Sequence, residues 1–183
     1  VRVGAPQGLP SAEVYEALVD ADGNLWFGTA AGLSRYCGDQ LEVFTDADFP
    51  GAGSVSAMAE DREERLWLAS DSGLVLYDGS AFTTYTAQEG LPDDAVEAVL
   101  VDRDGVLWAG THGGLARYDG KRFISFTKQD GLAGDEISAL LQDAGGVLWV
   151  ASWGEGLARY DGRRFEVAET NQAFPPRHVH TML

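Results

Sequence analysis

A tryptophan returns every 41 residues along this chain, and the short phrase around it returns with it. The phrase reads Leu-Trp-x-(Gly/Ala)-(Thr/Ser), and its four tryptophans are Trp26, Trp67, Trp108 and Trp149. A repeat of about 40 residues that contains several short strand-like runs is typical of the blades of a β-propeller. The period therefore predicts an all-β repeat architecture.

Each repeat divides into four apolar runs that are too short for helices and are bounded by Gly and Asp, which predicts four strands. In the third copy we expect strands at 96–101, 107–111, 115–118 and 123–126. Asp-Gly pairs between the runs favour tight hairpin turns, so the strands form an antiparallel meander. We predict one β-propeller segment over residues 1–183, with four complete blades at about 13–45, 54–86, 95–127 and 136–168.

The repeated tryptophan is expected to hold neighbouring blades together, because one four-stranded sheet cannot bury both of its faces alone. Two residues further on, the side chain stays small in every copy, at Gly28, Ala69, Gly110 and Ala151. We expect another backbone or a ring to press against that point. Gly110→Leu should then cost more than an ordinary overpacking change of roughly 1–3 kcal/mol.

The third copy, residues 96–118, reads Val-Glu-Ala-Val-Leu-Val-Asp-Arg-Asp-Gly-Val-Leu-Trp-Ala-Gly-Thr-His-Gly-Gly-Leu-Ala-Arg-Tyr. This phrase resembles the repeat of the two-component regulator propeller family. The resemblance implies a non-catalytic sensor or scaffold propeller on the periplasmic or extracellular side of a bacterial membrane. It also implies a fused or associated histidine kinase, or another signalling module, outside this segment.

The second copy departs most from the repeat, because Arg62–Arg65 replaces the turn that contains glycine in the other copies. We expect a less regular turn there. Residues 1–3 and 178–183 align with parts of further blades, and the family commonly closes with about seven. The chain is therefore expected to be an arc cut from a longer polypeptide. Bare apolar faces at its ends predict self-association or cover by further blades.

The charge of the chain limits its partners. Asp and Glu number 29 against 13 Lys and Arg, which gives a formal net charge of −16 at pH 7. This charge repels phosphate backbones, so nucleic acid is not an expected partner. A single cysteine excludes an internal disulfide, and no apolar run reaches the length of a membrane span.

Ligand contacts are expected on the face that carries the connections between second and third strands, together with those between blades. Residues that break the repeat on this face include Asp71, His112, Trp153 and Glu155, the last two beside the only insertion. An exposed aromatic ring with carboxylates suits a small molecule or an oligosaccharide. The competing interpretation is that these are ordinary surface side chains.

No catalytic, cofactor or metal site is predicted. Thr29, Ser70, Thr111 and Ser152 have no recurring base beside them, so we expect their hydroxyls to bond nearby backbone. The Asp-x-Asp-Gly sequences at 20–23 and 102–105 resemble the opening of a calcium loop, but they lack its remaining ligands and favour turns. The histidines and Cys37 show no zinc spacing.

An enzymatic alternative remains open. The sequence Asp-Gly-Asn-Leu-Trp-Phe at 22–27 is similar to the repeat of streptogramin lyase propellers. This chain then continues Gly28-Thr29, where those lyases continue Thr-Glu. His112 and Glu155 are the pair that would serve as lyase residues, and loss of turnover in His112→Ala would support that function.

Overall fold

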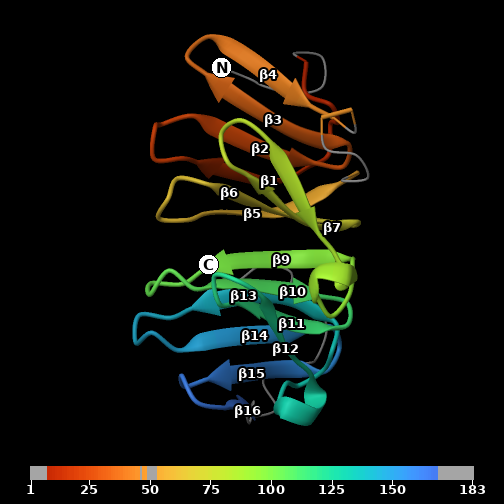
Figure 1. Cartoon of the computed structure of the whole chain (residues 1–183), viewed down its shortest axis with the longest axis vertical. Coiled ribbons are helices and arrows are strands. Elements are labelled where there is room, and N and C mark those ends of the chain that lie inside the picture. The colour runs from red at the N-terminus through yellow and green to blue at the C-terminus, as the bar shows by residue number, and fades with distance from the viewer. Residues whose placement is uncertain (1–7, 46, 49–52, 169–183) are drawn as a thin grey trace.

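The computed structural model describes residues 8–45, 47–48 and 53–168, and these residues form four antiparallel four-stranded sheets. In each sheet the four strands follow one another in chain order, and the sheets are stacked along the molecule (Figure 1). This confirms an all-β arc of four propeller blades. The two predicted partial strands, at 1–3 and 178–183, lie outside the described residues.

The sixteen strands keep nearly the same bounds in every blade. Blade 1 contains β1 (Val14–Val19), β2 (Leu25–Thr29), β3 (Gly32–Cys37) and β4 (Gln40–Phe44). Blade 2 contains β5 (Val55–Glu60), β6 (Leu66–Ser70), β7 (Gly73–Tyr77) and β8 (Phe82–Tyr85). Blade 3 contains β9 (Val96–Val101), β10 (Leu107–Thr111), β11 (Gly114–Tyr118) and β12 (Phe123–Phe126). Blade 4 contains β13 (Ile137–Gln142), β14 (Leu148–Ser152), β15 (Gly156–Tyr160) and β16 (Phe165–Val167).

The turn after each first strand is organised by one aspartate, which recurs in all four repeats. In blade 2 the Asp61 carboxylate accepts hydrogen bonds from the backbone N–H groups of Glu63 and Arg65, both at 3.0 Å. Its second oxygen accepts the Trp67 indole Nε1–H at 2.8 Å. Asp20, Asp102 and Asp143 accept the indole of their own blades at 2.8–2.9 Å. One side chain thus fixes both the turn and the orientation of the tryptophan.

The prediction of a less regular turn in blade 2 is wrong. Glu64 adopts a left-handed φ of 60°, where Gly23, Gly105 and Gly146 have φ of 84–85°. The Glu64 N–H donates to the Asp61 carbonyl at 3.1 Å, as Gly105 donates to Asp102 in blade 3. The aspartate contacts are strong enough to impose the same turn on a residue that disfavours this backbone conformation.

Three apolar clusters fill the three junctions between blades. At the first junction Trp26 packs with Val55, Leu68 and Tyr77 of blade 2, and its ring centroid lies 5.6 Å from that of Tyr77. The equivalent rings also meet in the next two junctions, in a tilted contact between Trp67 and Tyr118 and an edge contact between Trp108 and Tyr160. These three tryptophans are only 1–3% exposed. The predicted role of the tryptophan at blade junctions is confirmed for them.

In blades 1 and 3 the small residue two positions after the tryptophan lies against the next blade. A Cβ at Gly110 would lie 2.6 Å from Cγ2 of Ile137, and one at Gly28 would lie 2.7 Å from the Val55 carbonyl oxygen. The group that contacts this glycine is therefore the first residue of the next blade's first strand, through its aliphatic side chain or its backbone. It is not an aromatic ring.

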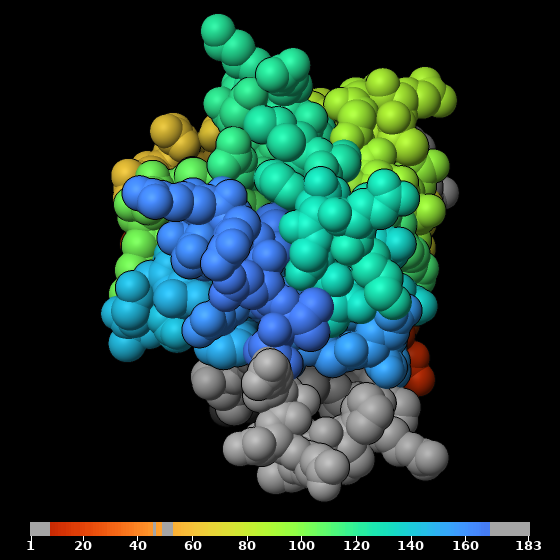
Figure 2. Space-filling view, turned by 90° about the horizontal axis from the view of Figure 1, so that it is seen from below, coloured from red at the N-terminus to blue at the C-terminus, as the bar shows by residue number. Residues whose placement is uncertain are grey.

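The two ends of the stack differ from its interior. Leu25 of blade 1 is 38% exposed, although Leu66, Leu107 and Leu148 at the same position are buried. Trp149 of blade 4 is half-buried, because no described sheet follows β16. Figure 2 looks onto this end of the stack, where blade 4 (blue) shares the surface with the end of blade 3 and the connection that follows it (teal). No described helix is long and apolar enough to cross a membrane.

Candidate functional site

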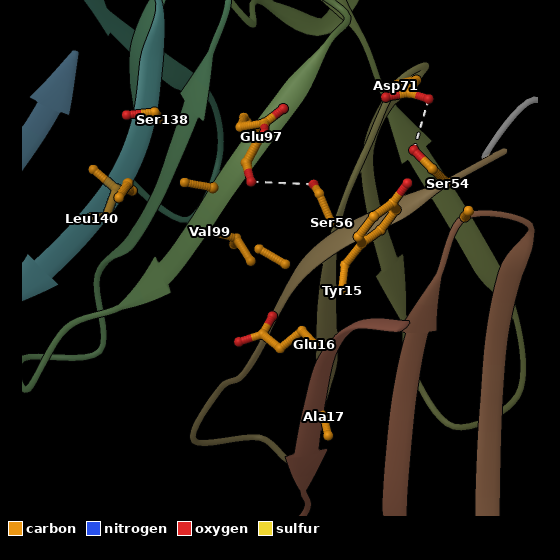
Figure 3. Close-up of a pocket in the computed structure, with 14 residues that line it drawn as sticks. Tyr15, Glu16, Ala17, Ser54, Ser56, Asp71, Glu97, Val99, Ser138 and Leu140 are labelled. Atoms are coloured by element: carbon orange, nitrogen blue, oxygen red, sulfur yellow. Dashed lines mark hydrogen bonds between the residues drawn. The ribbon is translucent and has the colours of Figure 1, made fainter. Parts of the chain in front are cut away.

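The first strands of the four blades, β1, β5, β9 and β13, lie in contact one after another and form one side of the stack. This side holds a hollow of about 830 Å³, lined by these strands and by three loop residues, Ala30, Ser54 and Asp71 (Figure 3). Ligand sites in proteins have volumes of this order and are often placed where several elements converge. We take this hollow as the candidate functional site.

A β-bulge in each first strand aims one side chain into the hollow. Pairing skips the second residue of all four strands, so that Val55 opposes Ser70 and Ala57 opposes Ala69, with Ser56 left out of register. The bulged residues are Tyr15, Ser56, Glu97 and Ser138. A bulge breaks the alternation of the strand and redirects the unpaired side chain. All four bulged residues line the hollow.

The bulged residues differ among the blades, although the residues around them repeat. The first position of the strand is Val14, Val55, Val96 or Ile137, whereas the second is an aromatic residue, a serine, a glutamate and again a serine. Our search for repeat-breaking residues considered loops and missed this position. When the four repeats are compared with one another, this position varies and is mostly polar, although the strand around it repeats. That contrast could have identified it.

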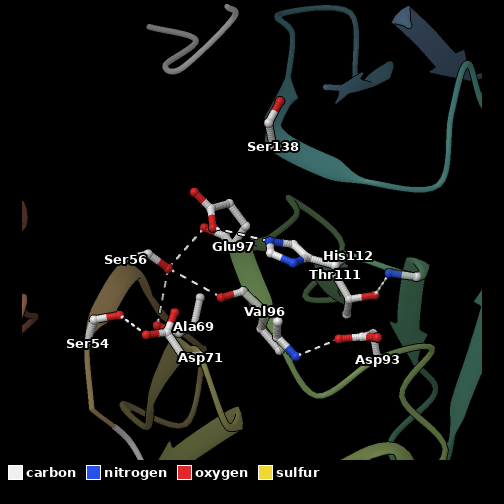
Figure 4. Close-up of polar contacts among 12 residues, drawn as sticks. Ser54, Ser56, Ala69, Asp71, Asp93, Val96, Glu97, Thr111, His112 and Ser138 are labelled. Atoms are coloured by element: carbon white, nitrogen blue, oxygen red, sulfur yellow. Dashed lines mark hydrogen bonds and ion pairs between the residues drawn. The ribbon is translucent and has the colours of Figure 1, made fainter. Parts of the chain in front are cut away.

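Hydrogen bonds from the lining tie one blade to the next. The Ser56 hydroxyl lies within 3.2–3.3 Å of the backbone carbonyl oxygens of Ala69, Val96 and Glu97, the last two in blade 3 (Figure 4). The Glu16 carboxylate accepts the backbone N–H of Met58 in blade 2. The residues that line the hollow therefore also connect the first strands of neighbouring blades.

Glu16 is a partly buried carboxylate that accepts a hydrogen bond from the backbone, and burial raises its pKa above the usual 4.5, although the hydrogen bond from Met58 acts the other way. The other three blades have alanine at this position, namely Ala57, Ala98 and Ala139. A glutamate is therefore not needed to build the strand. Its presence in blade 1 adds charge to the hollow at a cost in desolvation.

Asp71 and His112 stand at the same end of the hollow. Asp71 lines it and accepts a hydrogen bond from the Ser54 hydroxyl at 2.7 Å. His112 occupies the equivalent position in blade 3, and its Nε2 lies 3.7 Å from the Glu97 carboxylate (Figure 4). The loops that carry Asp71 and His112 lie beside the connections between blades. Asp71 bonds Ser54 in one connection, and the His112 N–H donates to Ala95 O in the next. The expected grouping of these two kinds of connection on one face is confirmed.

Trp153 and Glu155, the two predicted ligand residues of the fourth loop, have other contacts. The Glu155 carboxylate forms an ion pair with Lys128, in the short helix η3 (Lys128–Asp130). Trp153 is half-buried, and its backbone N–H donates to Glu136 O at 2.8 Å. Neither residue lines the hollow, whereas Asp71 does. The carboxylate that faces His112 is Glu97, a residue absent from our prediction.

The repeated hydroxyls have the structural role that we expected. Thr29, Ser70 and Thr111 donate to the carbonyl oxygens of Gly32, Gly73 and Gly114 at 2.8–2.9 Å. In blade 4 the inserted residue lengthens the loop, and Ser152 instead donates to Gly134 O at 2.9 Å. Among the described residues, no three His, Cys, Asp or Glu side chains are grouped closely enough to hold a metal ion.

Comparison with known proteins agrees with the repeat pattern. The model of the two component regulator propeller family matches residues 8–31, 90–113 and 131–154. These segments fall in the first, third and fourth repeats, and the second repeat, which departs most in sequence, is not matched. No curated protein matches this chain significantly in sequence.

Solved structures share the fold. The extracellular domain described as belonging to the hybrid two component system BT3049 from B. thetaiotaomicron has a TM-score of 0.78 and 25% identity, over 92% of this chain and 24% of its own. The extracellular domain of the one component system BT4673 from the same organism has a TM-score of 0.73 and 23% identity, over 85% of this chain and 25% of its own.

An enzyme also shares the fold. Virginiamycin B lyase from Staphylococcus aureus, in a catalytically inactive form with quinupristin, has a TM-score of 0.71 and 15% identity, over 88% of this chain and 57% of its own. The chain thus spans about a quarter of the two extracellular domains and just over half of the lyase. Three of the four repeats match the two component regulator propeller model, and the sheet order agrees with that match.

Proposed function

We propose that this chain is a non-catalytic recognition propeller of an extracytoplasmic bacterial receptor, and that its ligand binds in the hollow lined by the four first strands. The two neighbours described as extracellular domains of one and two component systems support this class of protein. A signalling module that is fused to the chain or associates with it would receive the signal. The ligand would be a small molecule or an oligosaccharide.

One observation carries the assignment to the hollow. Four bulges present three kinds of side chain, tyrosine, glutamate and serine, to one volume, although the structural positions around them repeat. Packing alone would favour the same residue in each blade, as it does for the tryptophans. Variation at the bulged position is therefore better explained by recognition than by stability.

A thermal-shift and calorimetric screen of small molecules and oligosaccharides tests this proposal. A hit should lose affinity in Tyr15→Ser and in Glu97→Ser, which install the residue that blades 2 and 4 already carry. Trp153→Ala and Glu155→Ala serve as a comparison, because these residues lie outside the hollow and remain predicted ligand contacts. Binding that depends on Trp153 and not on Tyr15 would move the site to the fourth loop.

The ligand screen does not show on which side of the membrane the site lies, so a second experiment tests the location. In spheroplasts of cells that express the parent protein, a protease added from outside should cleave the exposed turn at Arg62–Arg65 while the inner membrane is intact. Cleavage only after permeabilisation of the inner membrane would contradict an extracytoplasmic receptor.

The lyase alternative has one supporting contact, the approach of His112 to Glu97, which pairs a base with a carboxylate at the edge of the hollow. We expect no turnover of a streptogramin such as quinupristin. Turnover that is abolished by His112→Ala and by Glu97→Gln, with unchanged folding, would replace the receptor function with an enzymatic one.

A further inference from the structure

We propose that the hollow binds a small organic cation that carries two or more amino groups, of the kind represented by a linear polyamine. This inference rests on the proposed function, because it assigns a ligand class to the same hollow. It follows from the charges and the aromatic ring that line the volume, and from the three blades that supply the charges.

All charged groups that line the hollow are carboxylates. Glu16 belongs to blade 1, Asp71 to blade 2 and Glu97 to blade 3, and no described Lys or Arg lines the volume. The histidine beside Glu97, His112, has its Nε2 at 3.7 Å from that carboxylate. Carboxylates that share a recess raise the local concentration of cations and repel anions.

Glu16 is the least expected of the three. Alanine occupies the same position in every other blade, whereas Glu16 is partly removed from water and accepts a hydrogen bond from the Met58 backbone N–H. A partly buried carboxylate without a counter-charge costs stability, and a bound ammonium group would offset that cost. A cation bound in the hollow would therefore explain why a glutamate stands at this position.

Tyr15 supplies a second mode of attraction. It is 53% exposed, lines the hollow, and Figure 3 places its ring between Glu16 and the Ser54–Asp71 pair. An exposed aromatic face next to carboxylates attracts ammonium groups through the ring quadrupole. Hydroxyls of Ser54 and Ser56 near the ring offer acceptors for the N–H groups of the same ligand.

The separation of the charges selects an extended ligand over a single ion. The three carboxylates come from three blades around a hollow of about 830 Å³. A divalent metal ion needs several oxygens converging on one point. A flexible chain with amino groups at intervals can instead place one ammonium group near each carboxylate.

Calorimetry with spermidine as the probe tests the inference on the whole chain. We expect saturable binding at physiological salt that becomes roughly tenfold weaker in Glu16→Ala, because a charge-assisted hydrogen bond is lost. Tyr15→Ser should weaken binding several-fold. In an amide NMR spectrum, the Met58 N–H should shift on titration, since it donates to the Glu16 carboxylate.

The control must separate specific binding from general attraction to a chain of net charge −16. Asp39→Asn removes one exposed carboxylate in the turn between β3 and β4, and its affinity for spermidine should equal that of the unsubstituted protein. Equal losses in Asp39→Asn and Glu16→Ala would overturn the inference, because the attraction would then be non-specific.

Two further probes distinguish this inference from the proposed function. Binding of maltotriose that is lost in Tyr15→Ser, without binding of spermidine, would overturn the cation class and leave the hollow as the ligand site. Binding of Ca²⁺ that is lost in Glu16→Ala would replace the polyamine with a metal ion. No Tyr15-dependent binding of any of the three probes would overturn both proposals.

Discussion

Two neighbouring positions of the same strand behave in opposite ways. The first residue of β5, β9 and β13 is aliphatic and at most 2% exposed, and it packs into the preceding blade. The next residue is bulged out of register, faces the hollow and changes from blade to blade. The junction therefore tolerates little change, whereas the hollow accommodates residues as different as tyrosine and serine.

This difference shows how a repeat fold separates stability from recognition. The bulge redirects one side chain without disturbing the pairing on either side of it. Blade packing can then stay constant while the chemistry of the hollow varies. The predictions below test this separation, from the junctions with the largest expected effects to the hollow with the smallest.

Removal of a junction indole should have the largest effect. Trp67→Ala should lower the free energy of unfolding by about 3–5 kcal/mol, because the ring is fully enclosed between blades 2 and 3. Trp149→Ala is the matched control at the end of the stack, where the ring is only half-buried. Urea unfolding should show a clearly smaller loss for Trp149→Ala; equal losses would refute the interpretation that the next blade covers the ring.

Overpacking of a junction should come next. Gly110→Leu should destabilise the chain by more than about 3 kcal/mol, because even its Cβ would lie 2.6 Å from Ile137. Combining it with Ile137→Ala should recover part of the loss in a double-mutant cycle. Strictly additive effects in thermal unfolding would show that these two residues do not meet across the junction.

The aspartate that holds the indole should give an intermediate, pH-dependent effect. Burial raises the pKa of Asp61, but hydrogen bonds from Arg65 and Trp67 outweigh burial and lower this pKa from 3.8. A lowered pKa in the folded state adds stability above pH 3.8, and this stability is lost as the pH falls through the folded value. Asp61→Asn should therefore cost about 1–2 kcal/mol at pH 7.

The same comparison at acidic pH provides the check. Urea unfolding at pH 3 should show a smaller difference between Asp61→Asn and the unsubstituted protein than at pH 7. A difference that does not depend on pH would mean that the ionised carboxylate contributes nothing beyond its shape.

Substitution in the hollow should have the smallest effect on stability, and its sign should be reversed. Burial raises the pKa of Glu16 above 4.5, so its contribution to stability is fully present below that pH and is lost as the pH rises through the folded value. Glu16→Gln keeps an acceptor for the Met58 N–H and removes the charge. It should stabilise the chain at pH 7 by less than about 1 kcal/mol, since water screens the exposed part.

Thermal unfolding across pH 4 to 8 measures this effect. The gain in Glu16→Gln should shrink as the pH approaches 4. A loss of stability at pH 7 would indicate that the charged carboxylate stabilises the empty protein, which would contradict the contrast between junction and hollow.

The sequence predicted most of the fold because a repeat multiplies each local signal. The Leu-Trp phrase, the turn sequences and the small residue equivalent to Gly110 recur along the chain. Together they predicted the strand order and the core residues. The same reasoning failed at Glu64, where a residue that disfavours a left-handed backbone was taken as evidence for an irregular turn. The side chain of Asp61 determines that turn through its hydrogen bonds to neighbouring residues. The backbone preference of a single residue does not include such contacts.

The site was only partly predictable, for a related reason. Asp71 and His112 could be found because they interrupt a repeated loop, and both lie at the hollow or beside it. Tyr15, Glu16 and Glu97 were missed, because a regular strand would alternate its faces and a bulge is not visible in its residues. The distant partners of Glu155 and His112 were likewise not encoded by spacing.

The sequence by itself determined that this chain forms blades and which residues bury themselves between them, because periodic burial is a local property that is repeated in every copy. Only the tertiary structure decided which side chains share a volume. Side chains that are 41 residues apart in the sequence meet because stacking brings the first strands together, and the bulges turn those side chains toward one another.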